Sequence, residues 1–327
     1  DDDAALAEEM TGYPAEQDAF HLESLEEQKK VWFSGITKET FVALQNGAAG
    51  SGQPIELALE LDRPEWYEAY LSMESAVFFD AYFRRNQIPN PPVFHPDRLY
   101  IGNAFCPHLA PKEEELFALM DKACRESFSI TLTFPFLLEE NLTETQARLQ
   151  HLARWCEQKN KTIEIVVNDW GTAHLASQFP VFSLCLGVLL NKRKKDPRMP
   201  YKKGNVELLQ ENNLNAEFYR EYLEQEFGIH RFEWESCGYD MTLPPGKNSL
   251  HLPFYQTNTS QYCTLYAKCM TGERGKQKLA EECPKFCKDY AFLYPDHLIM
   301  IGRYNSLFAL DSRIFEDGSG SGTGTEI

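Results

Sequence analysis

The chain has 327 residues, of which 43% are apolar, so it is long enough to bury one large hydrophobic core or two smaller ones. Its formal net charge of -17 argues against nonspecific binding of nucleic acid or anionic lipid over the whole surface. No apolar run is long enough to span a bilayer, and the first residues, DDDAALAEEM, lack the basic and hydrophobic regions of a secretion signal. The sequence therefore predicts a soluble, cytoplasmic protein with no membrane span.

The two ends of the chain differ in composition from the middle. Residues 1–53 are rich in acidic side chains and include most of NGAAGSGQP, a linker by composition, so they are predicted to form an acidic, partly helical N-terminal arm. Residues 54–311 form the predicted main domain. Residues 312–327 end in EDGSGSGTGTEI, which contains almost nothing that a core can bury, and this segment is predicted to be a disordered tail.

Short strand-like runs alternate with amphipathic helical patterns in the main domain. Helical patterns include 113–127 and 214–228, and the second ends in Gly228, a natural helix stop. This alternation is typical of βαβ units with a parallel sheet, and eight strands favour a (β/α)8-type (TIM-like) barrel over an open sheet. Functional groups are then expected at the carboxyl ends of the strands. The predicted strands are 55–61, 99–105, 129–135, 163–169, 181–187, 229–236, 249–255 and 297–303.

Four of the nine cysteines lie within the stretch CTLYAKCMTGERGKQKLAEECPKFC at 263–287. An odd number of cysteines without a secretion signal makes a disulfide framework improbable and favours ligation of a metal or cluster. Cys283 and Cys287 are four residues apart, so on a helix both thiolates would point the same way and share one centre. Cys106 follows a predicted strand and is a candidate for a further ligand at the barrel mouth.

The remaining cysteines fall into two groups. Cys124 and Cys156 lie on apolar helix faces and Cys185 lies inside a strand, where a free cysteine behaves as a small apolar side chain. Cys237 and Cys269 are additional candidates, and either could replace Cys106, Cys263, Cys283 or Cys287 as a ligand. The spacing contains neither the C-x2-C pairs of most structural zinc sites nor the CxxxCxxC pattern of radical-SAM clusters, so spacing alone leaves both a 4Fe-4S cluster and zinc open.

The segments LYIGNAFCPHL, VVNDWG, SLHLPFYQTNTSQYC, ECPKFC and MIGRYNSLF together resemble the collagenase-like peptidase family U-32. The resemblance covers roughly residues 54–310 and is strongest to the branch of UbiU/UbiV-type iron-sulfur proteins. It implies a barrel with a 4Fe-4S cluster on Cys106, Cys263, Cys283 and Cys287, and a role in oxygen-independent hydroxylation. It also implies two alternatives: a peptidase, the activity that gave the family its name, and a noncatalytic subunit of a heterodimer.

Polar side chains at predicted strand ends are the candidates for catalysis. Asn168 and Asp169 end the strand IEIVVND, where they would either contact a substrate or form an Asx turn that closes a βα loop. His251 and Glu235 lie in late strands and are expected to reach the same mouth. For His251 the alternative is a core histidine with satisfied hydrogen bonds. No GxSxG, HExxH or phosphate-binding glycine loop is present.

A basic loop stands out in this acidic chain. Residues 188–204 contain seven basic residues and one acidic residue. Such a run is either a solvated loop or a binding site for an anion, an RNA backbone or an acidic protein. Residues 192–203 are therefore a candidate contact for an anionic or RNA partner.

Overall fold

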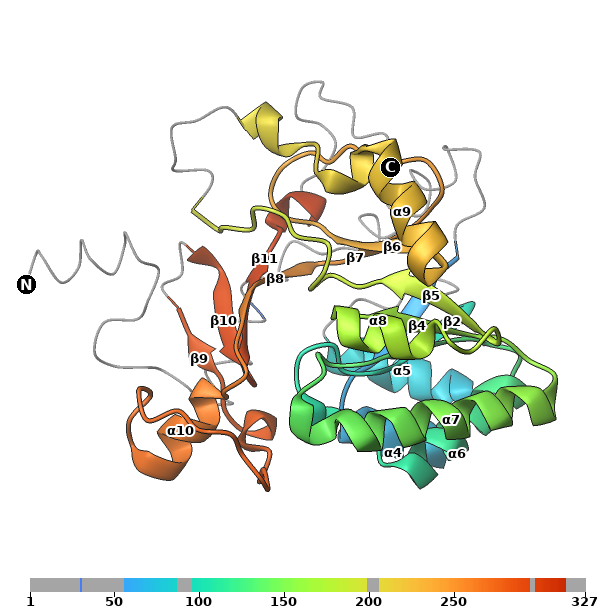
Figure 1. The fold of residues 1–327 in the computed structure, drawn as a ribbon. Helices are drawn as coiled ribbons and strands as arrows, with labels where there is room; N and C mark the ends of the chain where they lie inside the picture. The colour runs from blue at the N-terminus through green and yellow to red at the C-terminus, as the bar shows by residue number, and fades with distance from the viewer. Residues whose placement is uncertain (1–29, 31–55, 87–95, 199–205, 295–297, 316–327) are drawn as a thin grey trace, which may run out of the picture.

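The computed structural model describes Lys30 and residues 56–86, 96–198, 206–294 and 298–315. These residues form a parallel sheet with helices packed on one face and, later in the chain, a smaller antiparallel sheet (Figure 1). The predicted N-terminal arm, residues 1–53, lies outside the described residues except for Lys30. Of the predicted tail, residues 312–315 form a short 3-10 helix and the rest lies outside the described part.

The parallel sheet contains seven strands, which are neighbours in space in the same order as in sequence. Every neighbouring pair runs parallel. The strands are β1 Ala58–Leu61, β2 Arg98–Gly102, β3 Ser129–Thr133, β4 Ile163–Val167, β5 Phe182–Leu186, β6 Ile229–Glu235 and β7 Lys247–His251. The helices that connect them are α4 Pro64–Ser72, α5 Ser75–Arg85, α6 Glu113–Arg125, α7 Leu142–Lys159, α8 Trp170–Ala176 and α9 Glu217–Phe227.

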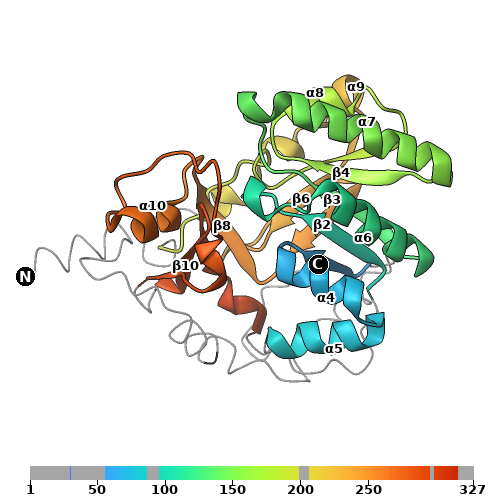
Figure 2. The same ribbon diagram turned by 90° about the horizontal axis from the view of Figure 1, so that it is seen from below.

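The main hydrophobic core lies between the outer face of this sheet and the helices (Figure 2). Alternate strand residues such as Leu61, Leu99 and Leu132 are fully or almost fully buried there, against helix residues such as Leu119 and Leu152. Because successive strand side chains point to opposite faces, this pattern directs the intervening residues to the inner face. The mixed α/β architecture predicted from the sequence is confirmed.

The inner face curls until side chains from distant strands touch. Tyr100 of β2 donates from its hydroxyl to Ser249 Oγ of β7 at 3.3 Å. Arg231 of β6 lies 3.6 Å from Glu164 of β4. A flat sheet would keep β2 and β7 five strand spacings apart, about 4.8 Å each, so the contact between Tyr100 and Ser249 requires strong curvature. Within the described residues, however, β1 and β7 do not pair, and the sheet remains open.

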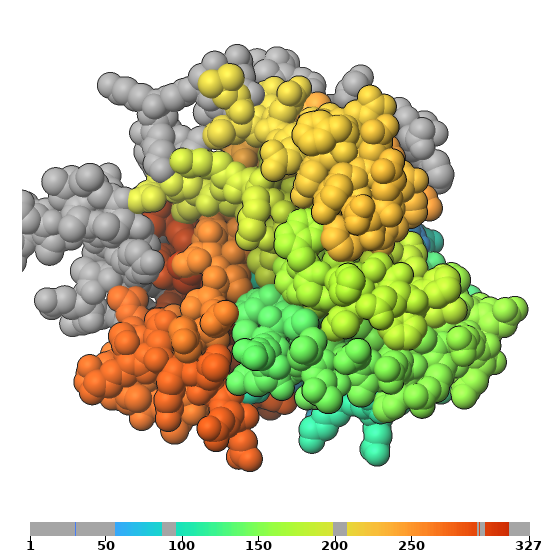
Figure 3. All heavy atoms as spheres, in the orientation of Figure 1, coloured from blue at the N-terminus to red at the C-terminus, as the bar shows by residue number. Residues whose placement is uncertain are grey.

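The second sheet is antiparallel, with the order β8-β11-β10-β9. Its strands are β8 Phe254–Thr259, β9 Phe292–Leu293, β10 Met300–Arg303 and β11 Ser306–Leu310, and helix α10 Thr264–Thr271 follows β8. The 3-10 helices of the described residues are η1 Pro107–Leu109, η2 Glu139–Asn141, η4 Val206–Leu209, η5 Asn213–Asn215, η6 Phe286–Lys288 and η8 Ser312–Phe315. In the space-filling view, the C-terminal segment in orange packs against the part that carries the parallel sheet (Figure 3).

The eighth predicted strand does not join the parallel sheet. The run at 297–303 contains β10, which pairs with β11 across a turn of only two residues, Tyr304 and Asn305. A turn this short reverses the chain, so it produces an antiparallel hairpin and leaves no room for a crossover helix. The predicted strand 249–255 is also divided, because β7 ends at His251 and β8 begins at Phe254 in the other sheet.

The connection between β6 and β7 lacks the expected crossover helix. Residues 236–246, which form this connection, are all described and contain no helix.

None of the helices in the described part of the chain is both long and apolar enough to cross a bilayer.

Candidate metal centre

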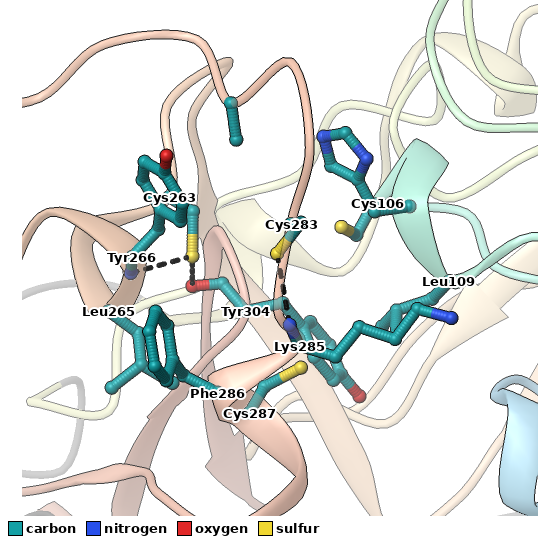
Figure 4. Close-up of a pocket in the computed structure, with 12 residues that line it drawn as sticks. Cys106, Leu109, Cys263, Leu265, Tyr266, Cys283, Lys285, Phe286, Cys287 and Tyr304 are labelled. Atoms are coloured by element: carbon teal, nitrogen blue, oxygen red, sulfur yellow. Dashed lines mark hydrogen bonds between the residues drawn. The ribbon is translucent and has the colours of Figure 1, made fainter. Parts of the chain in front are cut away.

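Cys106, Cys263, Cys283 and Cys287 line a single pocket. Figure 4 shows the four sulfur atoms turned toward the same space. Cys106 comes from the parallel-sheet part, whereas the other three come from the segment after β8. With its open mouth, the pocket has a volume of about 370 Å³. The other side chains around it are His108, Leu109, Leu265, Tyr266, Ala280, Lys285, Phe286 and Tyr304.

Cys106 is positioned by the turn that follows β2. Gly102 ends the strand with φ +119°, and a Cβ at this residue would lie 2.3 Å from the carbonyl oxygen of Thr133. Asn103 is 2% exposed, and its Oδ1 accepts from the backbone N–H of Phe105 at 2.9 Å and of Cys106 at 2.8 Å. These bonds fold the chain back and place the Cys106 thiol at the carboxyl end of the strand.

Cys263 is the N-cap residue of α10. Its sulfur accepts from the backbone N–H of Tyr266 at 3.3 Å, and its thiol donates to the carbonyl oxygen of Tyr304 at 3.0 Å. The unpaired N–H groups and the dipole at a helix N-terminus stabilise a thiolate. The helix therefore favours the charged form that a metal ligand needs.

Cys283 and Cys287 are not on an α-helix, contrary to the spacing argument. Pro284 has no N–H, and Lys285 adopts a left-handed conformation with φ +61°, so the chain turns between the two cysteines. Cys287 then lies in η6. The turn still directs both thiols into the pocket, and the backbone N–H of Lys285 donates to Cys283 Sγ at 3.4 Å.

Burial and mutual repulsion raise the pKa of Cys106, Cys263 and Cys287, which favours their protonated form when no cation is bound. Burial is the main cause in each case, and the neighbouring thiols add to it: the pKa of Cys106 is raised well above its ordinary value, that of Cys263 to about 12 and that of Cys287 to about 11. A bound metal reverses this preference for the protonated form, because it deprotonates a coordinating thiol outright.

Backbone donors oppose the rise in pKa at two of these thiols: the N–H group of His108 points at Cys106 Sγ, and those of Leu265 and Tyr266 point at Cys263 Sγ. The N–H group of Lys285 donates to Cys283 Sγ. Hydrogen bonds to sulfur stabilise thiolates and tune iron-sulfur clusters. Four thiols with backbone N–H donors are chemically the kind of donor set that iron-sulfur clusters use. Among the described residues, no three His, Cys, Asp or Glu side chains are placed to hold a single metal ion.

The other cysteines lie away from this pocket. Cys156 and Cys185 are fully buried, and Cys124 is half-buried against the main core. Cys237 is buried in the second core, and Cys269 packs against that core from α10. Neither of these two lines the pocket.

Asn168 and Asp169 are held by hydrogen bonds at the end of β4. Asn168 is 4% exposed; its Nδ2 donates to Phe134 O at 2.9 Å and its Oδ1 accepts from Leu189 N at 3.3 Å. Asp169 caps α8: its carboxylate accepts from Thr172 N at 2.7 Å, from Thr172 Oγ1 at 2.8 Å and from Leu137 N at 2.9 Å. These are the contacts of a turn that closes a βα loop. A catalytic role for the pair stays a prediction.

His251 lies on the inner face at the carboxyl end of β7. Its Nε2 is 3.3 Å from Glu233 Oε1, and its ring meets that of Tyr100 edge-on with centroids 5.7 Å apart. Burial alone would lower the pKa of His251, but the carboxylates of Glu233, Glu60 and Glu235 outweigh it and raise this pKa to about 9.

Glu60 and Glu233 were not predicted from the sequence as candidate functional residues. Burial raises the pKa of Glu60 to about 7, and the negative charges of Asp62 and Glu233 act in the same direction, against the opposing effect of His251. The strand pattern does indicate the position of Glu60. Leu59 and Leu61 alternate with Glu60, and this period of two directs the carboxylate to the inner face.

Some side chains of the basic loop make contacts within the molecule. Residues 192–198 are described, and 199–203 lie outside the described residues. Lys195 forms an ion pair with Glu235 and donates to Gln256 Oε1 at 3.0 Å, while the Arg193 guanidinium lies over the rings of Trp234 and Tyr239. Lys192 and Lys194 are exposed.

The chain was also compared with known proteins. No family model, no curated protein and no solved structure matches it.

Proposed function

We propose that the chain is a 4Fe-4S protein similar to the UbiU/UbiV-type branch of family U-32, and that it takes part in an oxygen-independent hydroxylation or a related redox modification. The observation that carries the proposal is the convergence of Cys106, Cys263, Cys283 and Cys287 on one pocket, with backbone N–H groups pointing at three of the sulfurs. The curled parallel sheet supports the barrel architecture that the resemblance implies.

In this proposal the four cysteines would hold the cluster, which supplies one-electron transfer when it is bound. Leu109, Leu265 and Phe286 surround the sulfurs with apolar surface and limit the access of water. Low local polarity and N–H donors are the features by which a protein tunes the potential of such a centre. A redox role is preferred to proteolysis because hydrolysis requires no cluster.

The proposal also covers location and partners. The nine cysteines are all free, as suits the reducing cytoplasm. A contact with an anionic or RNA partner would use Lys192 and Lys194, which are exposed, rather than Lys195, which is engaged by Glu235. A second protein subunit is a further candidate partner.

Metal content tests the cofactor directly. Protein purified without oxygen should be brown, with a broad absorption at about 400 nm and about four irons per chain. Cys283→Ala should abolish the colour, because one of the four thiolates is lost. Cys269→Ala is the matched control, since Cys269 lies in the same segment but outside the pocket, and it should keep the iron. Colourless protein with one zinc per chain would contradict the cluster.

Product analysis tests the activity. Cells with and without the gene are grown without oxygen, and their quinones, RNA nucleosides and peptides are compared by mass spectrometry. A product heavier by one oxygen atom that disappears with Cys283→Ala is the expected result. A difference confined to peptides that survives Cys283→Ala would instead support the peptidase.

A further inference from the structure

A second pocket adjoins the pocket of the four thiols, which we call the cysteine pocket. With its open mouth it has a volume of about 240 Å³. Among the described residues that line it, Glu65 is the one acidic side chain, and four are basic: Arg63, Lys285, Lys288 and Arg303. The whole chain has 32 basic and 49 acidic residues, so its composition alone would not gather cations in this way. We call this second site the cationic pocket.

The cationic pocket lies at the carboxyl end of β1 and beside a cysteine. Arg63 comes just after β1 and is the N-cap residue of α4, and Arg303 is the last residue of β10. Lys285 precedes η6 and Lys288 ends it, so these two lysines flank Cys287. A group bound among the cations would therefore lie beside Cys287. The residues that line both pockets are Leu109, Lys285, Cys287 and Tyr304 (Figure 4).

The two guanidinium groups of the cationic pocket are held in place but keep N–H groups free. Arg63 Nε donates to Asp62 Oδ1 at 2.8 Å. Arg303 donates from Nε and Nη2 to the carbonyl oxygen of Cys287, at 3.2 and 3.0 Å, and its guanidinium lies over the ring of Tyr304. The described residues offer no hydrogen-bond partner to Nη1 of either arginine. A guanidinium has five N–H donors in a planar fork that fits a carboxylate or a phosphate.

Acidic side chains offset two of the four cations. Asp62, which does not line the pocket, pairs with Arg63. Glu65 Oε1 lies 3.9 Å from Lys288 Nζ, and the Lys288 side chain is 60% exposed, so this second contact is weak.

Lys285 and Arg303 form no ion pair with an acidic side chain in the described part of the chain. Glu115 attracts Lys285 and Asp62 attracts Arg303, but both carboxylates lie beyond ion-pair distance. Both cations are half-buried, and a charge that is partly removed from water is stabilised by a bound counter-charge. The cationic pocket thus has two positive charges left for an anion.

A simpler role for these cations would be to offset the negative charge of four metal-bound thiolates. The geometry favours an external anion instead. Arg303 bonds the carbonyl oxygen of Cys287 and not a sulfur, and the cations surround a space that the other three thiols do not line.

We propose that Arg63, Lys285 and Arg303 bind a carboxylate or phosphate group of the substrate in the cationic pocket, beside Cys287. That the ligand is the substrate rests on the proposed function, whereas the binding of an anion rests on the pocket alone. Two guanidiniums and an ammonium recognise such a group by charge and by donated hydrogen bonds. Once it is anchored, the atoms next to it are presented to the cysteine pocket. The substrate class is therefore a carboxylic acid or a phosphate ester.

Calorimetric titration of the full chain, purified without oxygen, tests the site. Inorganic phosphate and malonate are the probes, each added at constant ionic strength so that general screening does not change. We expect one site per chain and an affinity about 10-fold weaker in Lys285→Gln, which removes a charged donor but keeps the backbone. Lys276→Gln is the matched control, because Lys276 is exposed in the same segment and outside the pocket. Tighter binding of malonate assigns a carboxylic acid, and tighter binding of phosphate assigns a phosphate ester.

Glu65→Gln tests the sign of the effect. Loss of the one acidic side chain among the described residues of the pocket should tighten anion binding about 3-fold, a gain that partial unfolding cannot imitate. Glu273→Gln is its control, because Glu273 pairs with Lys276 on the surface and should leave the affinity unchanged.

The iron content of the same samples separates the two proposals. Iron-loaded protein that binds neither probe would overturn the anion site and leave the proposed function standing, since the cations would then only offset the thiolates. Equal weakening in Lys285→Gln and Lys276→Gln would also overturn the site. Protein without iron that shows the expected pattern of affinities would keep the anion site and remove the redox role.

Discussion

Gly102 determines how the chain leaves β2 and therefore where Cys106 lies. Its φ of +119° is strained for any residue with a Cβ, and the added atom would also meet Thr133 O at 2.3 Å. Gly246 has a similar φ of +111° but has open space around its Cβ position. Comparing substitutions at the two glycines therefore separates the free-energy cost of the backbone conformation from the cost of a steric clash with the next strand.

Gly102→Ala should therefore be more destabilising than Gly246→Ala. We expect Gly246→Ala to lower the free energy of unfolding by about 1 kcal/mol, as the conformation alone requires. Gly102→Ala should lower it by about 3 kcal/mol, because β2 or β3 must also move. Urea denaturation measures both values. Equal losses would show that the sheet accommodates the extra atom without cost.

His251 makes the stability of the protein depend on pH. Its pKa of about 9 in the folded chain lies above the ordinary 6.5, so folding favours the protonated form. The stabilisation is complete below about pH 6.5 and is lost as the pH rises through about 9. His251→Gln should thus lower the free energy of unfolding on the order of 2 kcal/mol more at pH 6 than at pH 10. A pH-independent difference between variant and wild type would contradict the ion pair with Glu233.

Helix α8 begins with Asp169, whose carboxylate also connects the helix to the loop after β3. It accepts from Thr172 N and Thr172 Oγ1 within the helix and from Leu137 N across the loop. A capping side chain of this kind satisfies N–H groups that have no partner inside the helix. The helix start and the neighbouring loop are therefore fixed by one residue.

Asp169→Ala should destabilise the protein by about 2 kcal/mol, because it removes the cap and leaves Leu137 N without its acceptor. Thermal or urea unfolding measures the loss. Iron content should be unchanged, since Asp169 is not among the residues that line the cysteine pocket. If Asp169→Asn instead abolishes product formation in a stable, iron-loaded protein, the residue acts on the substrate as well as capping the helix.

The elements differ in how far the sequence predicted them. The first six strands have strong local patterns, and α9 ends at Gly228 with φ +66°, as predicted. The strand at 297–303 has the same pattern, but its partner is chosen by the two-residue turn at Tyr304, which the pattern does not reveal. The spacing of Cys283 and Cys287 indicated a shared site, although the left-handed conformation of Lys285 interrupts the helix from which that spacing was argued.

At the scale of the whole molecule, the cysteine pocket lies where the two sheets meet. Cys106 belongs to the loop after β2, and Cys263 follows β8 of the second sheet. The sequence pattern of one sheet cannot predict that these thiols lie together, because their relative position depends on packing between segments more than 150 residues apart. Local patterns nominated these cysteines only in part, and all four were named together only by the proposed resemblance to family U-32.

Asn305 connects the two sides of the pocket. It is 7% exposed, and its Nδ2 donates to the carbonyl oxygens of Phe105 and Ser260, each at 2.7 Å. Phe105 immediately precedes Cys106, and Ser260 lies three residues before Cys263. One amide group thus fixes the distance between the two cysteine-bearing segments.

Asn305→Ala should weaken retention of a cluster although all four thiols remain. Both carbonyl oxygens lose their donor, so the loop of Cys106 is freed from the second sheet, and a centre that needs four fixed ligands loses affinity. We expect the loss of absorption at about 400 nm in the presence of a chelator to be at least about 10-fold faster than in the wild type. Asn248→Ala is the control, because Asn248 also bonds a carbonyl oxygen, that of Pro244, but lies away from the pocket. If both variants release iron at the wild-type rate, the two sides of the pocket are held together by packing rather than by Asn305. If only Asn248→Ala releases it faster, the pocket depends on the parallel sheet instead.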